Sequence, residues 1–170
     1  AARILAGSRM DGNYRMSAAE KSEIYVKIAE CFLAEEEISE SDAAVSKAGI
    51  FIEQIDKKEN HTSLLLRYKS TLARVLDANR KFLAAATRYH ELSQNSDSLI
   101  DKDELLEFLG RAATCIILAP SGPQRQRILQ HIATDERLSQ LESIHEFQHH
   151  GRILTKMQKQ MVIRKPELVE

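Results

Sequence analysis

Apolar residues recur every three or four positions along most of this 170-residue chain, and this spacing predicts one helix after another. In the first such segment, Ile24, Ile28 and Phe32 fall on one side of a helix. Ser17 and Glu20 precede them in the S-x-x-E pattern that caps a helix start. Alternation of apolar and polar residues, which is typical of strands, never continues beyond four positions. The pattern therefore predicts an all-α protein.

Polar stretches separate the predicted helices, namely AEEEISESD, KKENHT, SQNSDS and APSGP. Side chains that can accept a hydrogen bond from a free backbone N–H group lie at the expected starts of the later helices. Asp101 is followed three residues later by Glu104, and Gly122 is followed by a proline that suits the first helical position. The expected starts are Ser39 or Ser41, Thr62, Asp101, and Ser121 to Pro123.

The long helices expected to begin near residues 18, 62 and 102 repeat at an interval of about 40 residues, which is typical of helical-repeat proteins. The segment RKFLAAATRYHEL carries Phe82, Ala85 and Tyr89 in the pattern of the second helix of a tetratricopeptide-like unit. A small residue such as Ala85 suits a close crossing, because packed helix axes lie about 8–10 Å apart. We therefore expect a right-handed superhelix of tetratricopeptide-like helix pairs. The expected core includes Tyr68, Phe82, Tyr89, Cys31 and Cys115.

Composition narrows the function only slightly. The formal net charge is −1, so no strong field favours nucleic acid or an anionic membrane surface. No apolar run reaches the roughly 20 residues that a membrane-spanning helix needs. The two cysteines belong to no spacing motif, which favours a reduced, intracellular protein. We expect no cofactor, no nucleic-acid partner and no membrane partner.

Residues 145–149 read HEFQH and match H-E-x-x-H, the zinc-binding helix of many metallopeptidases. On a helix His145 and His149 would share a face, and Glu146 would be the general base. A third histidine ligand is missing, since Thr155 stands six residues after His149, and the glutamates that could replace it, Glu167 and Glu170, lie at the end of the sequence. We expect a helix from about Ser143 to Met161 whose inward residues are Ile144, Phe147, Leu154 and Met161. Surface histidines are the favoured interpretation, and a zinc peptidase is the alternative.

Two charged groups are candidates for contact with partner proteins. The first consists of Arg125, Arg127 and Arg137, with Asp135 and Glu136 close in sequence. Mixed charges of this kind more often form caps and local ion pairs than a binding surface. The second consists of Glu35, Glu36 and Glu37, which form either a solvated turn or a contact for a basic partner, since turns on the edge of a helical repeat often dock partners.

Two long stretches carry a resemblance to a known family. YKSTLARVLDANRKFLAAATRYHELS resembles the helical-repeat part of PCI-domain proteins, which are scaffold subunits of the COP9 signalosome, the proteasome lid and a translation initiation factor complex. CIILAPSGPQRQRILQHIATDERLSQL is similar to the signalosome branch, with its C-x-I-L-A turn followed by Q-R-x-R and D-E-R. The proteasome-lid paralogue shares an I-L-A-P turn but not this combination.

The resemblance implies a non-catalytic scaffold in the cytoplasm and nucleus. Such a subunit binds sister PCI and MPN subunits and the cullin-RING ligase, while a separate zinc-dependent subunit removes the ubiquitin-like modifier from cullins. The proteasome lid is the alternative complex. The resemblance also implies a helical-repeat domain over residues 1–161, cut within a first helix that Gly7 would end. Residues 162–170 would lead to a winged helix outside this sequence.

Overall fold

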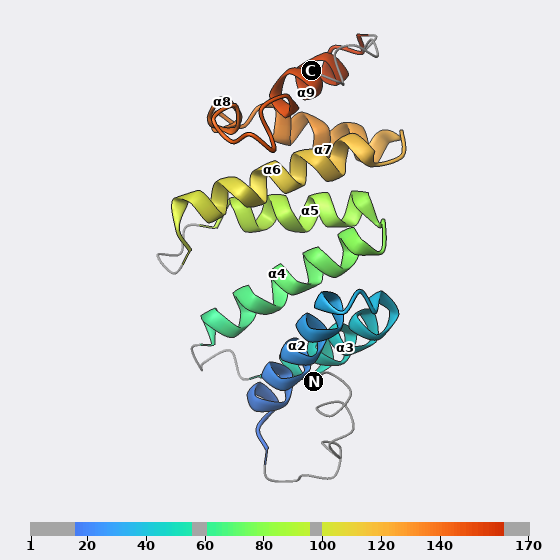
Figure 1. Ribbon diagram of the computed structural model, residues 1–170, viewed down its shortest axis with the longest axis vertical. Helices are drawn as coiled ribbons and strands as arrows, with labels where there is room; N and C mark the ends of the chain where they lie inside the picture. Colours follow the sequence, from blue (N-terminus) through green and yellow to red (C-terminus); the bar gives the residue numbers. More distant parts are fainter. Residues whose placement is uncertain (1–15, 56–60, 96–99, 162–170) are drawn as a thin grey trace. The chain divides into compact units, whose positions relative to one another are not determined.

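The computed structural model describes residues 16–55, 61–95 and 100–161, and every helix or strand assigned within these ranges is an α-helix (Figure 1). The all-α prediction is therefore confirmed for the described residues. The chain divides into two compact units, Ala1–Arg80 and Lys81–Glu170. The helices are α2 (Ala18–Ala34), α3 (Ile38–Ile52) and α4 (Thr62–Ala78) in the first unit, and α5 (Phe82–Ser93), α6 (Lys102–Leu118), α7 (Pro123–Ala133), α8 (Leu138–Leu141) and α9 (His150–Gln158) in the second.

The starts of α2, α4 and α6 at residues 18, 62 and 102 confirm the expected interval. The helix expected to end at Gly7, and residues 162–170, lie outside the described residues. In the part of the chain that the structure describes, we find no helix that combines the length and the apolar character needed to cross a bilayer.

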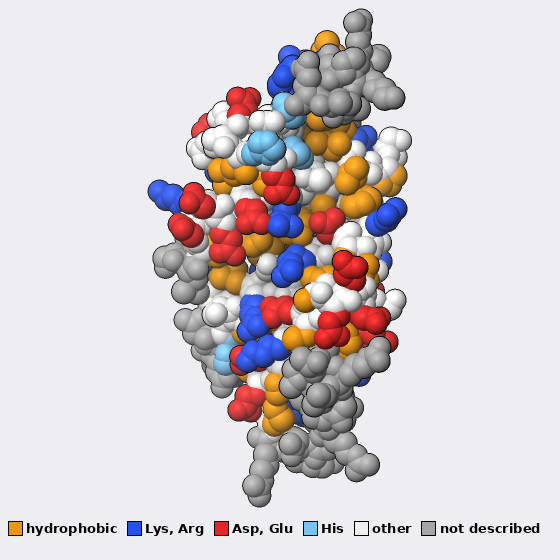
Figure 2. Space-filling model, in the orientation of Figure 1, with side chains coloured by type: hydrophobic (Ala, Val, Ile, Leu, Met, Phe, Trp, Pro, Cys, Tyr) orange, Lys and Arg blue, Asp and Glu red, His pale blue; other side chains and the backbone are white. Residues whose placement is uncertain are grey.

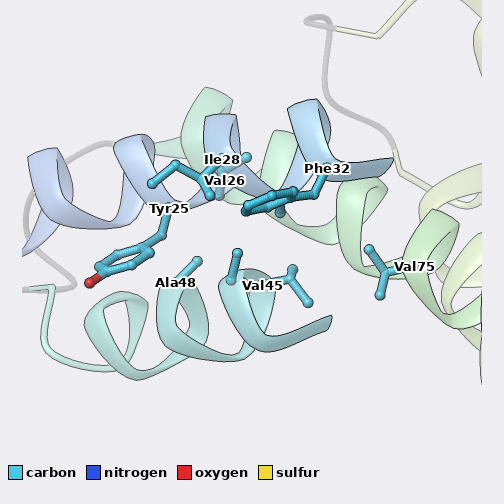
Figure 3. Close-up of a cluster of buried hydrophobic side chains, with 9 residues drawn as sticks. Tyr25, Val26, Ile28, Phe32, Val45, Ala48 and Val75 are labelled. Carbon is cyan, nitrogen blue, oxygen red and sulfur yellow. The ribbon is translucent and has the colours of Figure 1, made fainter. Parts of the chain in front are cut away.

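The first unit is built on the α2–α3 pair, with α4 packed against both helices. The predicted cap of α2 is confirmed, because Glu20 N donates to Ser17 Oγ at 3.2 Å and Ser17 N donates to Glu20 Oε2 at 2.8 Å. Figure 3 shows apolar side chains of α2 pointing toward α3. The buried cluster consists of Tyr25, Val26, Ile28, Ala29, Phe32, Ala44, Val45, Ala48 and Val75.

The predicted caps of α3 and α4 are wrong. The N-cap residue of α3 is Glu37, whose side chain makes no capping hydrogen bond. Ser41 lies inside α3, fully buried, and its hydroxyl donates to Ala29 O of α2 at 2.8 Å. This hydroxyl therefore serves the packing of two helices rather than the start of one. For α4 the N-cap residue is His61, and Thr62 is the first helical residue.

An ion pair joins α2 to α4 at the edge of the first unit. Arg67 Nε donates to Glu30 Oε1 at 2.8 Å, and Thr71 Oγ1 donates to the same oxygen at 3.2 Å. Partial burial would raise the pKa of Glu30, but the hydrogen bond and charge of Arg67, together with Thr71 and Arg74, lower it overall. Glu30 is therefore charged at neutral pH and holds α4 against α2.

The second unit is centred on α6, the helix with the most buried residues, and α5, α7, α8 and α9 all contact it. Asp101 caps α6 as predicted, accepting a hydrogen bond from Lys102 N at 2.7 Å. Ala85 and Tyr89 of α5 are fully buried, and Tyr89 stacks on Phe108 of α6 with ring centroids 6.3 Å apart. The small residue of the repeat pattern thus lies on a helix that packs against α6.

The expected core residues divide between buried and half-buried positions. Tyr89 and Cys115 are buried as expected, whereas Tyr68, Phe82 and Cys31 are only half-buried. Cys31 and Tyr68 pack against the buried cluster of the first unit while keeping part of their surface in water.

The helix predicted from Ser143 to Met161 is wrong in its first half. Residues 142–149 form turns, and α9 begins only at His150. Phe147 N donates to Ile144 O at 2.9 Å and His150 N donates to Phe147 O at 3.0 Å, so the turns close over three residues rather than four. Phe147 and Leu154 are buried as predicted, but Ile144 is half-buried and Met161 is 56% exposed.

Candidate functional site

The HEFQH segment does not have the geometry of a zinc-binding helix. It lies in turns, so His145 and His149 are not placed on one helical face by a four-residue spacing. His145 and Glu146 are exposed, and the Nε2 atom of the half-buried His149 lies 2.9 Å from Gln148 Nε2. Figure 2 shows histidine side chains at the surface over this end of the second unit. Among the described residues, no group of three His, Cys, Asp or Glu side chains is arranged to hold a metal ion.

The middle residue of HEFQH is the one with a structural role. Phe147 is 2% exposed and its ring lies against Gly110 of α6, where a Cβ atom would come within 2.7 Å of Phe147 Cγ. The ring also meets His150 edge-on, with centroids 5.4 Å apart. The absence of a side chain at Gly110 therefore makes the space that Phe147 fills.

Arg137 has an intramolecular role. Its guanidinium pairs with Asp135, with Nη2 to Oδ2 at 2.7 Å and Nε to Oδ1 at 3.0 Å. Nη1 also donates to Ser93 O at the end of α5 at 2.6 Å. Burial would raise the pKa of Asp135, yet its hydrogen bonds from Arg137 lower it. Arg137 thus ties the turn after α7 to the C-terminus of α5.

Arg125 caps the C-terminus of α6. Its Nε donates to Ile116 O at 3.0 Å and its Nη2 donates to Ile117 O at 3.3 Å. The last carbonyl groups of a helix have no partner inside the helix, and a guanidinium there also complements the helix dipole. Arg127, two residues on, is exposed, and so is Glu136. The structure therefore gives Arg125 and Arg137 structural roles and leaves Arg127 on the surface.

The three glutamates of the AEEEISESD stretch, Glu35, Glu36 and Glu37, form an exposed acidic turn between α2 and α3 (Figure 2). Glu36 has φ 61°, a left-handed conformation that glycine or asparagine usually adopts. Glu35 directly follows the last residue of α2, so its carboxylate lies near the negative end of that helix dipole, and no basic residue in the last turn offsets it. The turn therefore combines two locally unfavourable features and presents negative charge to solvent.

Sequence reasoning missed a basic groove on the second unit. An open pocket of about 350 Å³ lies along α9. Its signal in the sequence is the spacing of Arg152, Lys156 and Lys159, which places three cations on one helical face. The lining residues are Glu142, Gly151, Arg152, Thr155, Lys156, Lys159 and Met161.

Comparison with known proteins gives relatives that are similar over almost all of this chain. The COP9 signalosome complex subunit 4 of Arabidopsis thaliana is 34% identical over 164 residues, covering 94% of this chain and 37% of that protein. The protein of the same name from Dictyostelium discoideum is 35% identical, with 98% of this chain and 39% of the relative covered. The Drosophila melanogaster protein of that name is 33% identical over 100% of this chain and 39% of its own length.

The chain thus spans well under half the length of the curated relatives that it matches. A family model described as "PSMD12/CSN4, N-terminal" matches residues 1–103, which is more than half of the chain. The helical architecture, the matched segment and these relatives agree, and the chain belongs to the PSMD12/CSN4 family.

Proposed function

We propose that this chain is part of a non-catalytic PCI scaffold subunit of the COP9 signalosome. The observation that carries the proposal is the similarity to signalosome subunit 4 of three organisms over 94–100% of this chain. Packed helix pairs such as α2–α3 and α5–α6 suit this role, because repeat proteins offer extended surfaces to partners. The partners would be sister PCI and MPN subunits and the cullin-RING ligase, in the cytoplasm and nucleus. The paralogous proteasome-lid subunit is the second candidate, because the family description covers both branches.

In this proposal the acidic turn Glu35–Glu37 contacts a basic surface of the cullin-RING ligase. Exposed charge of one sign supports electrostatic steering of a partner of the opposite sign. Among the three arginines, Arg127 is the one that we propose for partner contact, because its side chain is exposed while Arg125 and Arg137 are engaged within the chain.

The proposal assigns no catalysis to this chain. Phe147, the centre of the zinc-site pattern, is buried against α6, and the two histidines belong to turns. The contribution of the subunit to cullin deneddylation is then binding and positioning, and the chemistry belongs to another subunit.

The test uses the full-length parent, alone and within its purified complex, with a modifier-conjugated cullin as substrate. We expect no release of the modifier by the parent alone and rapid release by the complex. Replacing Glu35, Glu36 and Glu37 by lysine should weaken cullin-RING binding by about tenfold, and replacing the exposed Glu53 by lysine should have little effect. Modifier release by the parent alone, abolished by His149→Ala, would instead support the peptidase alternative.

A further inference from the structure

The acidic stretch between α2 and α3 contains two serines that differ sharply in their surroundings. Ser39 is exposed in the first turn of α3. Ser41, two residues later, is fully buried and its hydroxyl donates to Ala29 O at 2.8 Å. One sequence stretch thus presents one accessible hydroxyl group and one that is enclosed and already hydrogen-bonded.

Ser39 has a dense set of carboxylates around it. Five acidic residues lie within four positions of Ser39, whereas the exposed Ser143 has only two, Glu142 and Glu146. Protein kinases select substrates by charge pattern, and a kinase with a basic substrate groove binds carboxylates around the acceptor hydroxyl. The five are Glu35, Glu36, Glu37, Glu40 and Asp42.

Local structure allows Ser39 to reach a kinase. The N-cap residue Glu37 makes no side-chain capping bond, and the backbone bond that opens the helix runs from Ser41 N to Glu37 O at 3.0 Å. Ser39 therefore precedes the first helical donor, so that extending the chain around it opens only the first turn of α3. The buried hydroxyl of Ser41 keeps the rest of α3 anchored on α2.

We propose that Ser39 is a phosphorylation site for an acidophilic serine/threonine protein kinase. In the reaction Ser39 Oγ forms a bond to the γ-phosphorus of ATP, the bond from that phosphorus to the β–γ bridging oxygen breaks, and ADP leaves. The hydroxyl proton passes to the catalytic carboxylate of the kinase. The product phosphate lies in the first turn of α3, whose N-cap residue makes no side-chain capping bond and where the helix dipole favours negative charge.

This inference does not rest on the signalosome assignment. It makes the acidic turn a surface whose charge is adjustable, because a phosphate adds about 1.5 to 2 negative charges at neutral pH.

The test incubates the folded full-length parent with Mg²⁺, ATP and a purified acidophilic casein kinase, and locates phosphate by tandem mass spectrometry. We expect phosphate on Ser39 and none on Ser41. The variant Ser39→Ala replaces an exposed side chain and should keep the circular dichroism spectrum of the wild type. It should take up no phosphate between residues 35 and 42. The double variant E36Q/E40Q should be modified about tenfold more slowly, since it removes two exposed carboxylates.

Three results would overturn the proposal. One is an unmodified Ser39 in the folded parent under conditions in which a peptide of residues 34–44 is phosphorylated. Another is phosphate on Ser41. The third is a rate of Ser39 phosphorylation in E36Q/E40Q equal to that of the wild type. That result would show that the surrounding carboxylates do not contribute to kinase recognition.

Discussion

Arg137 and Ser93 are 44 residues apart in sequence, yet Arg137 Nη1 donates a hydrogen bond to the carbonyl oxygen of Ser93 at 2.6 Å. The same guanidinium pairs with Asp135, which also accepts from Gln94 Nε2 at 2.9 Å. The end of α5 and the turn after α7 are therefore held together by one partly buried network. Arg137, one of the sequence candidates for partner contact, therefore has a structural role within the second unit, which is the role that its mixed-charge surroundings favoured.

The first prediction concerns this network. Arg137→Ala should lower the free energy of unfolding by about 1–3 kcal/mol, because it leaves Asp135 and Ser93 O without their charged donor. Arg127→Ala is the matched control and should change it by less than about 0.5 kcal/mol, since that side chain is exposed. Urea unfolding monitored by circular dichroism measures both. Equal effects of the two substitutions would contradict the assignment of Arg137 to a structural role.

A second prediction concerns the packing of Phe147 on Gly110. A Cβ atom at position 110 would lie 2.5 Å from Phe147 Cε2, so Gly110→Ala should destabilise the second unit by about 1–3 kcal/mol. Phe147→Ala should cost about 3–5 kcal/mol, because it empties a buried site. In the double variant the added methyl group meets no ring, so the two costs should not add. Strict additivity in thermal or urea unfolding would show that the contact does not exist.

The third prediction addresses zinc. Because His145 and His149 lie in turns, incubation with EDTA should leave the thermal unfolding midpoint unchanged, and His149→Ala should leave the zinc content of the purified full-length protein unchanged. Differential scanning calorimetry and elemental analysis provide the two measurements. One zinc ion per chain, lost in His149→Ala, would restore the metallopeptidase hypothesis.

A fourth prediction concerns pH and His90 on α5. Burial lowers the pKa of His90 below the ordinary 6.5; the charge of Asp135 opposes this shift, and His131 and Arg137 add to it. The unfolded chain then binds a proton more readily than the folded chain. The contribution of His90 to stability is therefore present above about pH 6.5 and is lost as the pH falls through the lowered folded pKa.

Urea unfolding at several pH values between about 7.5 and 5 tests this dependence. His90→Gln should flatten the decline in stability, whereas the control His145→Gln, at an exposed position, should retain it. An identical pH profile in wild type and His90→Gln would contradict the prediction.

The parts of the fold that the sequence predicted are those that local signals determine. The capping box of Ser17 and Glu20 and the cap at Asp101 depend on residues within three positions, and both are present. The interval between α2, α4 and α6 follows from hydrophobic spacing alone. These features need no knowledge of which helices meet.

The errors arose where a distant contact decides the local structure. The local sequence suggests that Ser41 caps a helix. In the structure its hydroxyl donates instead to Ala29 O of α2, a contact that the local sequence does not reveal. The apolar residues before α9 have the spacing of a helix. The segment nevertheless forms turns, and in these turns Phe147 is buried against Gly110 of α6. For the arginines, caps and local ion pairs were the favoured interpretation, but the sequence could not identify every partner, because Arg125 and Arg137 also bond to carbonyl groups at the ends of other helices. Exposed residues that contact partner proteins produce no local sequence pattern comparable to a helix cap. The surface that contacts partners is therefore a proposal.

The most direct test of the central claim is native mass spectrometry of the full-length parent, affinity-purified from its own cells, followed by identification of every component. The account predicts one assembly that contains the parent with sister PCI and MPN subunits, and cullins among the associated proteins. Recovery with proteasome ATPases and lid subunits, or as a single zinc-containing chain, would contradict it.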